Sequence, residues 1–129
     1  MASKRVLSVG QCGADHGAIS RTLQVNFRAE VVPADTADEA LSVLRREKDF
    51  ALVLVNRVLD GDGADGVRLI DQIKAEETLR GLPVMLVSNY DDYQRRAVAA
   101  GAVPGFGKAA LGQPHVLGRL REFLAEGAS

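Results

Sequence analysis

The sequence predicts an α/β fold in which a parallel sheet of five strands is covered by helices on both faces. Residues 50–56 read FALVLVN, an apolar run without alternation, as expected for a central parallel strand that is buried on both faces. Similar short apolar runs alternate along the chain with segments of helical periodicity, and the connections between them are short. Five such units predict a doubly wound sheet with the strand order 2-1-3-4-5.

The individual elements follow from local signals. Strands are predicted at residues 6–9, 29–33, 50–56, 83–88 and 102–107. Helices are predicted to begin near residues 15, 36, 65, 91 and 114. Asp15 is the expected N-cap of the first helix, Thr36 and Glu39 have the spacing of a capping box, and Pro114 suits a first helical turn. The fifth strand is the weakest prediction because Pro104 interrupts it.

Length and composition restrict the functions to consider. The 129 residues suit one domain, residues 1–129, and a net charge of −1 favours neither nucleic acid nor a membrane surface as a partner. No apolar run approaches the length of a membrane span, and no signal peptide is expected before the first strand. A single cysteine fits a reducing compartment, so a cytoplasmic location is expected.

Polar residues gather at the carboxyl ends of the predicted strands, where open parallel sheets place their ligands. The expected order brings the ends of strands one, three, four and five around one crevice. The residues at those ends are Gly10, Gln11, Asn56, Ser88 and Lys108.

The order of elements and several local motifs resemble the receiver domain of bacterial response regulators, the chemotaxis-type fold. The resemblance spans the whole chain and is carried by ADTADEAL at 34–41, DG at 65–66, LPVMLVS at 82–88, and AGA at 100–102 followed by Lys108. In that family two acids at the end of strand one hold Mg²⁺, and an aspartate ending strand three accepts phosphate from a histidine kinase. A hydroxyl residue ending strand four and a lysine after strand five contact the phosphoryl group.

The match at the phosphorylation site is partial. Ser88 and Lys108 stand where the hydroxyl and the lysine belong, but Gly10 and Gln11 replace the acidic pair and Asn56 replaces the acceptor. An amide nitrogen is a very poor nucleophile compared with a carboxylate, and Mg²⁺ is usually held by carboxylates. The resemblance therefore implies a degenerate receiver without metal, cofactor or enzymatic activity.

The same resemblance implies that the domain acts by binding a protein of a signalling pathway, such as a histidine kinase or an output protein. The family uses helix four, strand five and helix five for such contacts, and Tyr90, Tyr93 and Phe106 are the candidate contacts here. Two further positions depart from the family: Gly105 stands at the aromatic switch position, and Ala109 replaces the proline after the lysine.

One alternative keeps the phosphorylation chemistry with a substitute acid. Asp60 follows the central strand and would serve as the acceptor if the loop brought it beside Lys108. The loop also resembles a calcium-binding EF-hand sequence, but Ala64 and Asp65 break that register by one residue.

A second alternative is a module that binds a small anion or a nucleotide. The Gly10–Gly17 turn follows a strand and opens a helix, as phosphate-binding turns do, without matching a known motif. Lys108 and Arg57 are expected to approach the crevice without carboxylate partners, which would form a small anion pocket. Otherwise Lys108 is expected to hydrogen-bond to Asn56 or to loop carbonyls, or to pair with Asp60.

Overall fold

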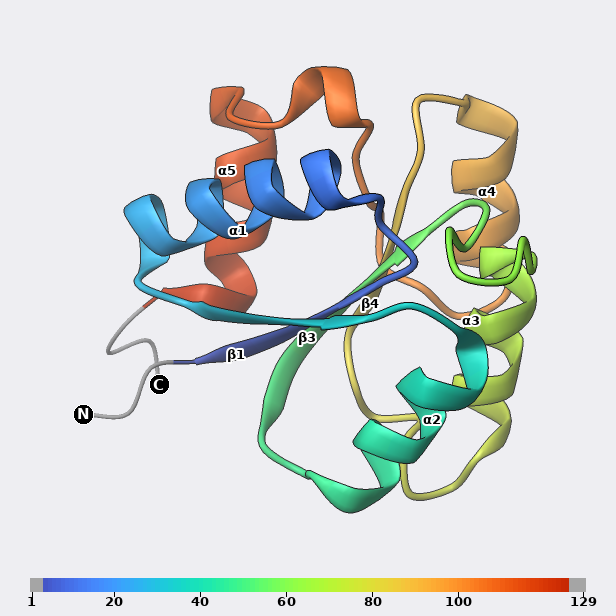
Figure 1. Ribbon diagram of the computed structural model, residues 1–129. Coiled ribbons are helices and arrows are strands. Elements are labelled where there is room, and N and C mark those ends of the chain that lie inside the picture. Colours follow the sequence, from blue (N-terminus) through green and yellow to red (C-terminus); the bar gives the residue numbers. More distant parts are fainter. Residues whose placement is uncertain (1–3, 126–129) are drawn as a thin grey trace.

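The computed structural model describes residues 4–125, which form one parallel sheet between two layers of helices (Figure 1). The strands are β1 (Arg5–Val9), β2 (Glu30–Ala34), β3 (Phe50–Asn56) and β4 (Val84–Val87), in the spatial order β2-β1-β3-β4. The helices are α1 (Gly13–Phe27), α2 (Ala37–Arg46), α3 (Gly66–Ala75), α4 (Asp91–Ala99) and α5 (Pro114–Leu124), with a 3-10 turn η1 at Lys108–Ala110. The predicted fold class is confirmed.

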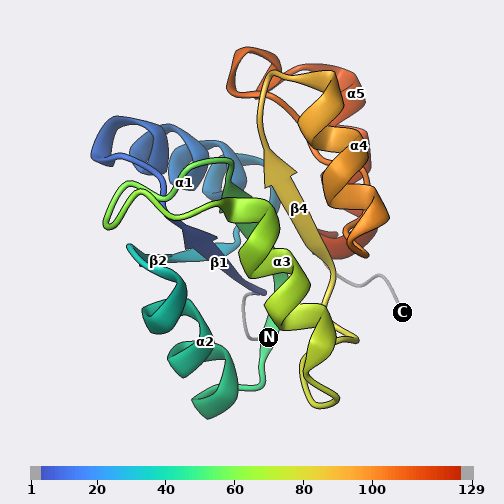
Figure 2. The ribbon, with the colours of Figure 1, turned by 90° about the vertical axis from the view of Figure 1, so that its right-hand side faces the viewer.

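Helices cover both faces of the sheet, α1 and α5 on one side and α2, α3 and α4 on the other (Figures 1 and 2). The side chains of β3 explain why its sequence is apolar throughout. Leu52 and Leu54 pack with α1 and α5, whereas Val53 and Val55 pack with the opposite layer, and all four are fully buried. A strand that contributes to two cores has no solvent face to mark with polar residues.

Helix starts largely follow the local sequence signals. The Thr36 hydroxyl accepts a hydrogen bond from the Glu39 N–H at 3.1 Å, and the Asp65 carboxylate caps α3 by accepting from the Val67 N–H at 3.0 Å. Pro114 occupies the first turn of α5, where its missing N–H has no intrahelical role. These caps fix where α2, α3 and α5 begin.

The start of α1 differs from the prediction. The helix begins at Gly13 with Cys12 in the N-cap position, and no side chain caps it. The assignment of Asp15 as the N-cap is therefore wrong, because Asp15 lies within the first helical turn. Its carboxylate is consequently free to reach another element.

The predicted fifth strand, residues 102–107, is not a strand. Its chain runs beside β4 but forms only an isolated parallel bridge at Phe106, so the sheet has four strands rather than the predicted five. The Phe106 N–H donates to Leu86 O at 3.3 Å, and its carbonyl accepts from the Ser88 N–H at 2.9 Å. The Val103 N–H also donates to Val84 O at 2.9 Å, but the next ladder donor, the Gly105 N–H, donates to Gln94 Oε1 instead of to β4, so a continuous ladder does not form.

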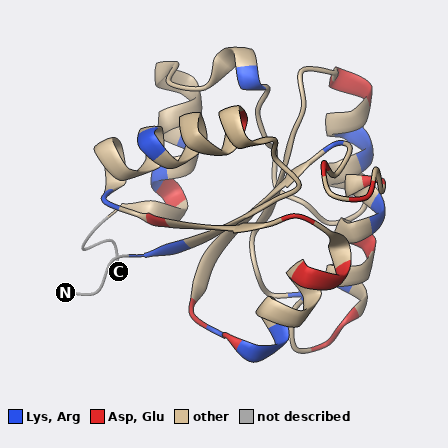
Figure 3. Cartoon of the chain, in the orientation of Figure 1, with Lys and Arg blue, Asp and Glu red and all other residues tan. Residues whose placement is uncertain are grey.

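None of the helices within residues 4–125 has the length and hydropathy that crossing a lipid bilayer requires. Acidic and basic residues are spread over several elements (Figure 3), and α2 and α4 each carry acids in the first turn and arginine in the last. The loop after β3 and the start of α4 are locally acidic, since they carry Asp60, Asp62, Asp91 and Asp92.

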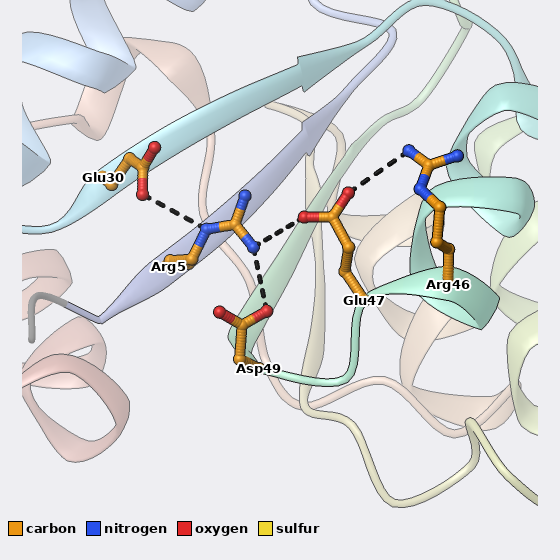
Figure 4. A network of polar contacts seen from close by, with 5 residues as sticks. All are labelled: Arg5, Glu30, Arg46, Glu47 and Asp49. Atoms are coloured by element: carbon orange, nitrogen blue, oxygen red, sulfur yellow. Dashed lines mark hydrogen bonds and ion pairs between the residues drawn. The ribbon is translucent and has the colours of Figure 1, made fainter.

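A charged network secures the amino-terminal edge of the sheet, at the opposite end of β1 from the candidate site (Figure 4). The Arg5 guanidinium donates to Glu30 at 3.2 Å, to Glu47 at 2.8 Å and to Asp49 at 2.8 Å. Arg46 also donates to Glu47, at 3.2 Å. The hydrogen bond from Arg5, followed by that from Arg46, lowers the pKa of the Glu47 carboxyl. The network joins β1, β2 and the loop before β3.

We expect Arg5→Met to lower stability at neutral pH, because three carboxylates lose a shared cation. A carboxyl whose pKa is lowered on folding contributes stability above its unfolded pKa and loses it as the pH falls through the folded value. The stability gap between the wild-type protein and the variant should therefore close in acid, measured by urea unfolding between pH 7 and pH 3. Arg21→Met, at an exposed position of α1, is the control and should show little gap at any pH. A gap that persists at pH 3 would contradict the electrostatic explanation.

Candidate functional site

Asn56 ends β3 and joins three backbone segments through its carboxamide. Its Nδ2 donates to Gly10 O at 3.1 Å and to Val58 O at 2.7 Å. The NH₂ group of asparagine has two hydrogens to donate, whereas an ionised carboxylate has none. Asn56 therefore links the end of β1 to the loop after β3 through two donated hydrogen bonds. An ionised aspartate in the same place would be unable to donate either of them.

Gly10 lies directly after β1 with a positive φ of 72°, which favours glycine. A Cβ atom there would lie 2.5 Å from Leu59 Cδ2 and 2.7 Å from Leu59 Cα. Leu59 is fully buried, and the neighbouring Asp60 N–H donates to Gly10 O at 2.9 Å. The loop after β3 thus packs where a side chain of residue 10 would project.

The residues present do not fit a resident Mg²⁺. Gln11 is 6% exposed and neutral, and neither polar atom of its side chain has a partner within the described residues. Gly10 supplies no side-chain ligand and Asn56 turns its NH₂ group to two carbonyls. No group of three or more His, Cys, Asp or Glu residues in the range 4–125 is placed to hold a metal ion. Hard divalent cations are held chiefly by carboxylate oxygens, which this end of β1 lacks.

Lys108 is paired with an acid from another element. Its Nζ lies 2.6 Å from Asp15 Oδ2 in the first turn of α1, and the Cys12 thiol donates to the same oxygen at 3.2 Å. The hydrogen bond from Lys108, and after it that from Cys12, lowers the pKa of Asp15. The prediction that Lys108 lacks a carboxylate partner is wrong, and it neither hydrogen-bonds to Asn56 nor pairs with Asp60.

Ser88 follows β4 and is buried, with 6% of its surface exposed. Its Oγ accepts a hydrogen bond from the Tyr90 N–H at 3.1 Å, which folds the chain into the start of α4. A serine hydroxyl that accepts in this way still has its own hydrogen to donate.

Gln94 fastens α4 to the sheet edge where the fifth strand was expected. Its Nε2 donates to Leu86 O at 2.9 Å and to Ser88 O at 3.1 Å, while its Oε1 accepts from the Gly105 N–H at 3.2 Å. A Cβ atom at position 105 would collide with Leu86 O, so glycine allows this close approach. The Gln94 carboxamide thus supplies contacts that a regular strand would have made through its backbone.

Aromatic and basic side chains gather beside the crevice. The Arg57 guanidinium carbon lies 5.1 Å from the centre of the Tyr90 ring and 4.9 Å from that of Tyr93. Arg96 approaches Tyr93 at 4.9 Å. Tyr90 is 56% exposed, whereas Phe106, the third predicted contact, is only 4% exposed and packs in the core. The cation–π geometry of Arg57 could not be foreseen from sequence because it joins residues over 30 positions apart.

A crevice of about 160 Å³ lies at the carboxyl ends of β3 and β4. It brings together three residues of the predicted phosphorylation site, Asn56, Ser88 and Lys108, with Arg57 and the predicted partner contact Tyr90. The other predicted phosphorylation-site residues do not line the crevice. These are Gly10, Gln11 and the substitute acid Asp60.

A larger open groove of about 760 Å³ runs between α4 and α5 along the segment that replaces the fifth strand. Its apolar lining includes Val98, Pro104 and Phe106, and its basic lining includes Arg95 and Arg119. The groove lies on the face of helix four, strand five and helix five to which the family resemblance assigns partner contacts.

No protein-family model matches the sequence, and no curated protein matches it. Solved structures do match the fold. The signal receiver domain of a DNA-binding response regulator from Colwellia psychrerythraea 34H superimposes with a TM-score of 0.77 at 22% identity, covering 93% of this chain and 97% of that one. The chain has the receiver fold.

Two further structures agree with this conclusion. A putative response regulator from Chloroflexus aurantiacus J-10-fl has a TM-score of 0.75 at 19% identity, over 95% of this chain and 98% of that chain. A response regulator from Thermotoga maritima has a TM-score of 0.72 at 26% identity, over 95% and 98%. The receiver fold therefore extends over almost the whole length of the chain.

We expect Asn56→Asp to destabilise the protein by about 1–3 kcal/mol at neutral pH, because a carboxylate would face two carbonyl oxygens. The protonated carboxyl has one donor, so the two carbonyl oxygens favour that form and raise the pKa of the new side chain on folding. Such a group is least harmful below its unfolded pKa and most harmful above its folded one. The cost, measured by chemical denaturation, should therefore be larger at pH 7 than at pH 3. Asn26→Asp, at an exposed asparagine that donates to one carbonyl, should cost less; equal costs would refute this role of Asn56.

Proposed function

We propose that this protein is an atypical receiver domain that is not phosphorylated and that transmits signals by binding another protein. The observation that carries the proposal is the pair of hydrogen bonds from Asn56 Nδ2 to Gly10 O and Val58 O. The residue at the phosphate-acceptor position is an asparagine whose NH₂ group donates hydrogen bonds to the loop. It has no ionisable oxygen to attack phosphorus.

Two other features support the same conclusion independently. Leu59 fills the space beside Gly10 where a metal-binding side chain would project, and Gln11 brings no charge. Lys108 is already neutralised by Asp15 at 2.6 Å. Phosphoryl transfer depends on a fixed acceptor beside a bound cation, and each part of that arrangement is replaced.

The substitute acceptor Asp60 is less well supported. Its side chain is exposed, it does not line the crevice, and its backbone N–H is bonded to Gly10 O. A nucleotide site at the Gly10–Gly17 turn is also less well supported, because residues 13–17 are the first turns of α1 and not an extended glycine-rich loop.

The partner surface that we propose is the groove between α4 and α5 together with Tyr90 and Tyr93. The groove lining combines apolar residues with the charged residues Asp91, Arg95 and Arg119, and the exposed fractions are 45% for Val98 and 56% for Tyr90. Exposed aromatic and apolar side chains next to an open groove are typical of protein interfaces. We place this interaction in the cytoplasm.

We expect no covalent adduct when the protein is incubated with acetyl phosphate or beryllofluoride in the presence of Mg²⁺. The measurement is intact mass for the phosphoryl group and ¹⁹F NMR for beryllofluoride, with a receiver domain that carries the acceptor aspartate as the positive control. A stoichiometric adduct that disappears in Asp60→Ala would overturn the proposal in favour of the substitute acid.

We expect Val98→Asp to weaken capture of the native partner from a lysate of the source cells by about tenfold or more, because a charge enters the proposed interface. Val25→Asp is the matched control, since Val25 is 75% exposed and lies on α1 away from the groove. Quantitative pull-down with mass spectrometry gives both values. Equal loss for the two variants, or none for either, would count against this face as the binding surface.

A further inference from the structure

The groove between α4 and α5 has the size and the lining of a site for a small organic molecule. Its volume of about 760 Å³ lies within the range of about 300–1,000 Å³ that is typical of ligand pockets. Val98 and Pro104 supply exposed apolar surface, and Phe106, which also lines the groove, is buried. An apolar lining of this extent favours a ligand with an apolar body.

Small residues form the part of the lining that joins the two helices. They are Gly105, Gly107, Ala109 and Ala110. A Cβ atom at position 105 would collide with Leu86 O, and one at position 107 would collide with Asn89 Oδ1. The two glycines thus let the chain lie close to its neighbours, and they leave its backbone without covering side chains. A flat ring can approach such a backbone more closely than a surface of long side chains.

Two arginines from different helices give the groove a positive charge. Arg95 belongs to α4 and Arg119 to α5, whereas the acid among the described lining residues is Asp91. The ion pairs formed within residues 4–125 include neither arginine. Arg119 donates to Gly105 O, which orients its guanidinium and leaves further N–H groups in the plane of the fork. With His115 neutral, the lining has one positive charge in excess, which a carboxylate balances.

We propose that this groove reversibly binds a small organic acid that has a flat apolar body and one carboxylate. The body lies against Val98, Pro104 and the exposed glycine backbone. The carboxylate accepts two parallel hydrogen bonds from the oriented guanidinium of Arg119, since the planar fork matches its two oxygens. Arg95 adds a second positive charge from α4. Binding involves no covalent step.

The acid would be a second kind of ligand for the surface that we propose for the protein partner. Once bound, it would cover Val98 and compete with a protein that uses the same groove. In a receiver that is not phosphorylated, the concentration of the acid would then regulate partner binding. This regulatory consequence rests on the proposed function, whereas binding of the acid itself does not.

Titration with naphthalene-2-carboxylate, followed by ¹H–¹⁵N NMR at constant pH and ionic strength, tests the site on the full chain. We expect saturable shifts at the amides of Val98, Gly105 and Gly107, with a Kd of about 1 mM or tighter. Naphthalene-2-carboxamide has the same body without the charge, and we expect it to bind at least about fivefold more weakly. Acetate has the charge without the body and should give no saturable shift over the same concentrations.

Variants of the two arginines test the contribution of charge. Arg119→Gln and Arg95→Gln should each weaken binding of the carboxylate by at least about threefold and leave binding of the carboxamide unchanged. Arg95→Gln decides the matter if Arg119→Gln proves poorly folded. Arg121→Gln, at an exposed arginine of α5 outside the groove, is the matched control and should leave both affinities unchanged.

Four results would overturn the proposal: shifts that do not saturate, shifts centred outside the groove, equal affinities for the two naphthalene compounds, or groove variants that behave like Arg121→Gln. None of these measurements involves a protein partner. Failure to find a partner therefore counts against the proposed function alone, and failure of the titration counts against this inference alone.

Discussion

The carboxamide of Asn56 is the constraint on which the crevice and its surrounding loops depend. Its two hydrogen bonds tie β3 to the end of β1 and to the loop that follows β3. That loop then brings Leu59 against Gly10, and the Asp60 N–H gives Gly10 O a further donor. These contacts depend on one another, and the neutral carboxamide of Asn56 supplies two of their hydrogen bonds.

Side-chain contacts hold the edge of the sheet beside β4. A receiver fold with only four regular strands must still fix its fourth helix, and here the Gln94 carboxamide does so through contacts to Leu86, Ser88 and Gly105. The chain beside β4 therefore stays close without a ladder, and the groove beside it remains open. Packing at this edge is held by side-chain polar contacts, which depend more on individual residues than backbone pairing does.

Much of this fold could be predicted from sequence because its signals are local. The uniform apolar run of β3, the capping residue Thr36 and the first-turn Pro114 each determine their own element, and parallel strands necessarily bring Asn56 and Ser88 to one edge. The errors concern contacts between residues that are far apart in the sequence. The sequence signal of an acid near a helix start is the same for an N-cap and for a first-turn residue. The ion pair between Asp15 and Lys108 could therefore not be predicted.

The close packing of Leu59 against Gly10 makes an acidic side chain at position 10 difficult to accommodate. An acidic side chain at position 10 alone would collide with Leu59. Substitution of Leu59 alone by a smaller residue would leave a cavity, because Leu59 is fully buried. Aspartate at position 56 alone would lose the hydrogen bonds that Asn56 donates to Gly10 O and Val58 O. Acidic side chains at positions 10 and 56 would therefore require several coupled substitutions, because each single variant is expected to be less stable.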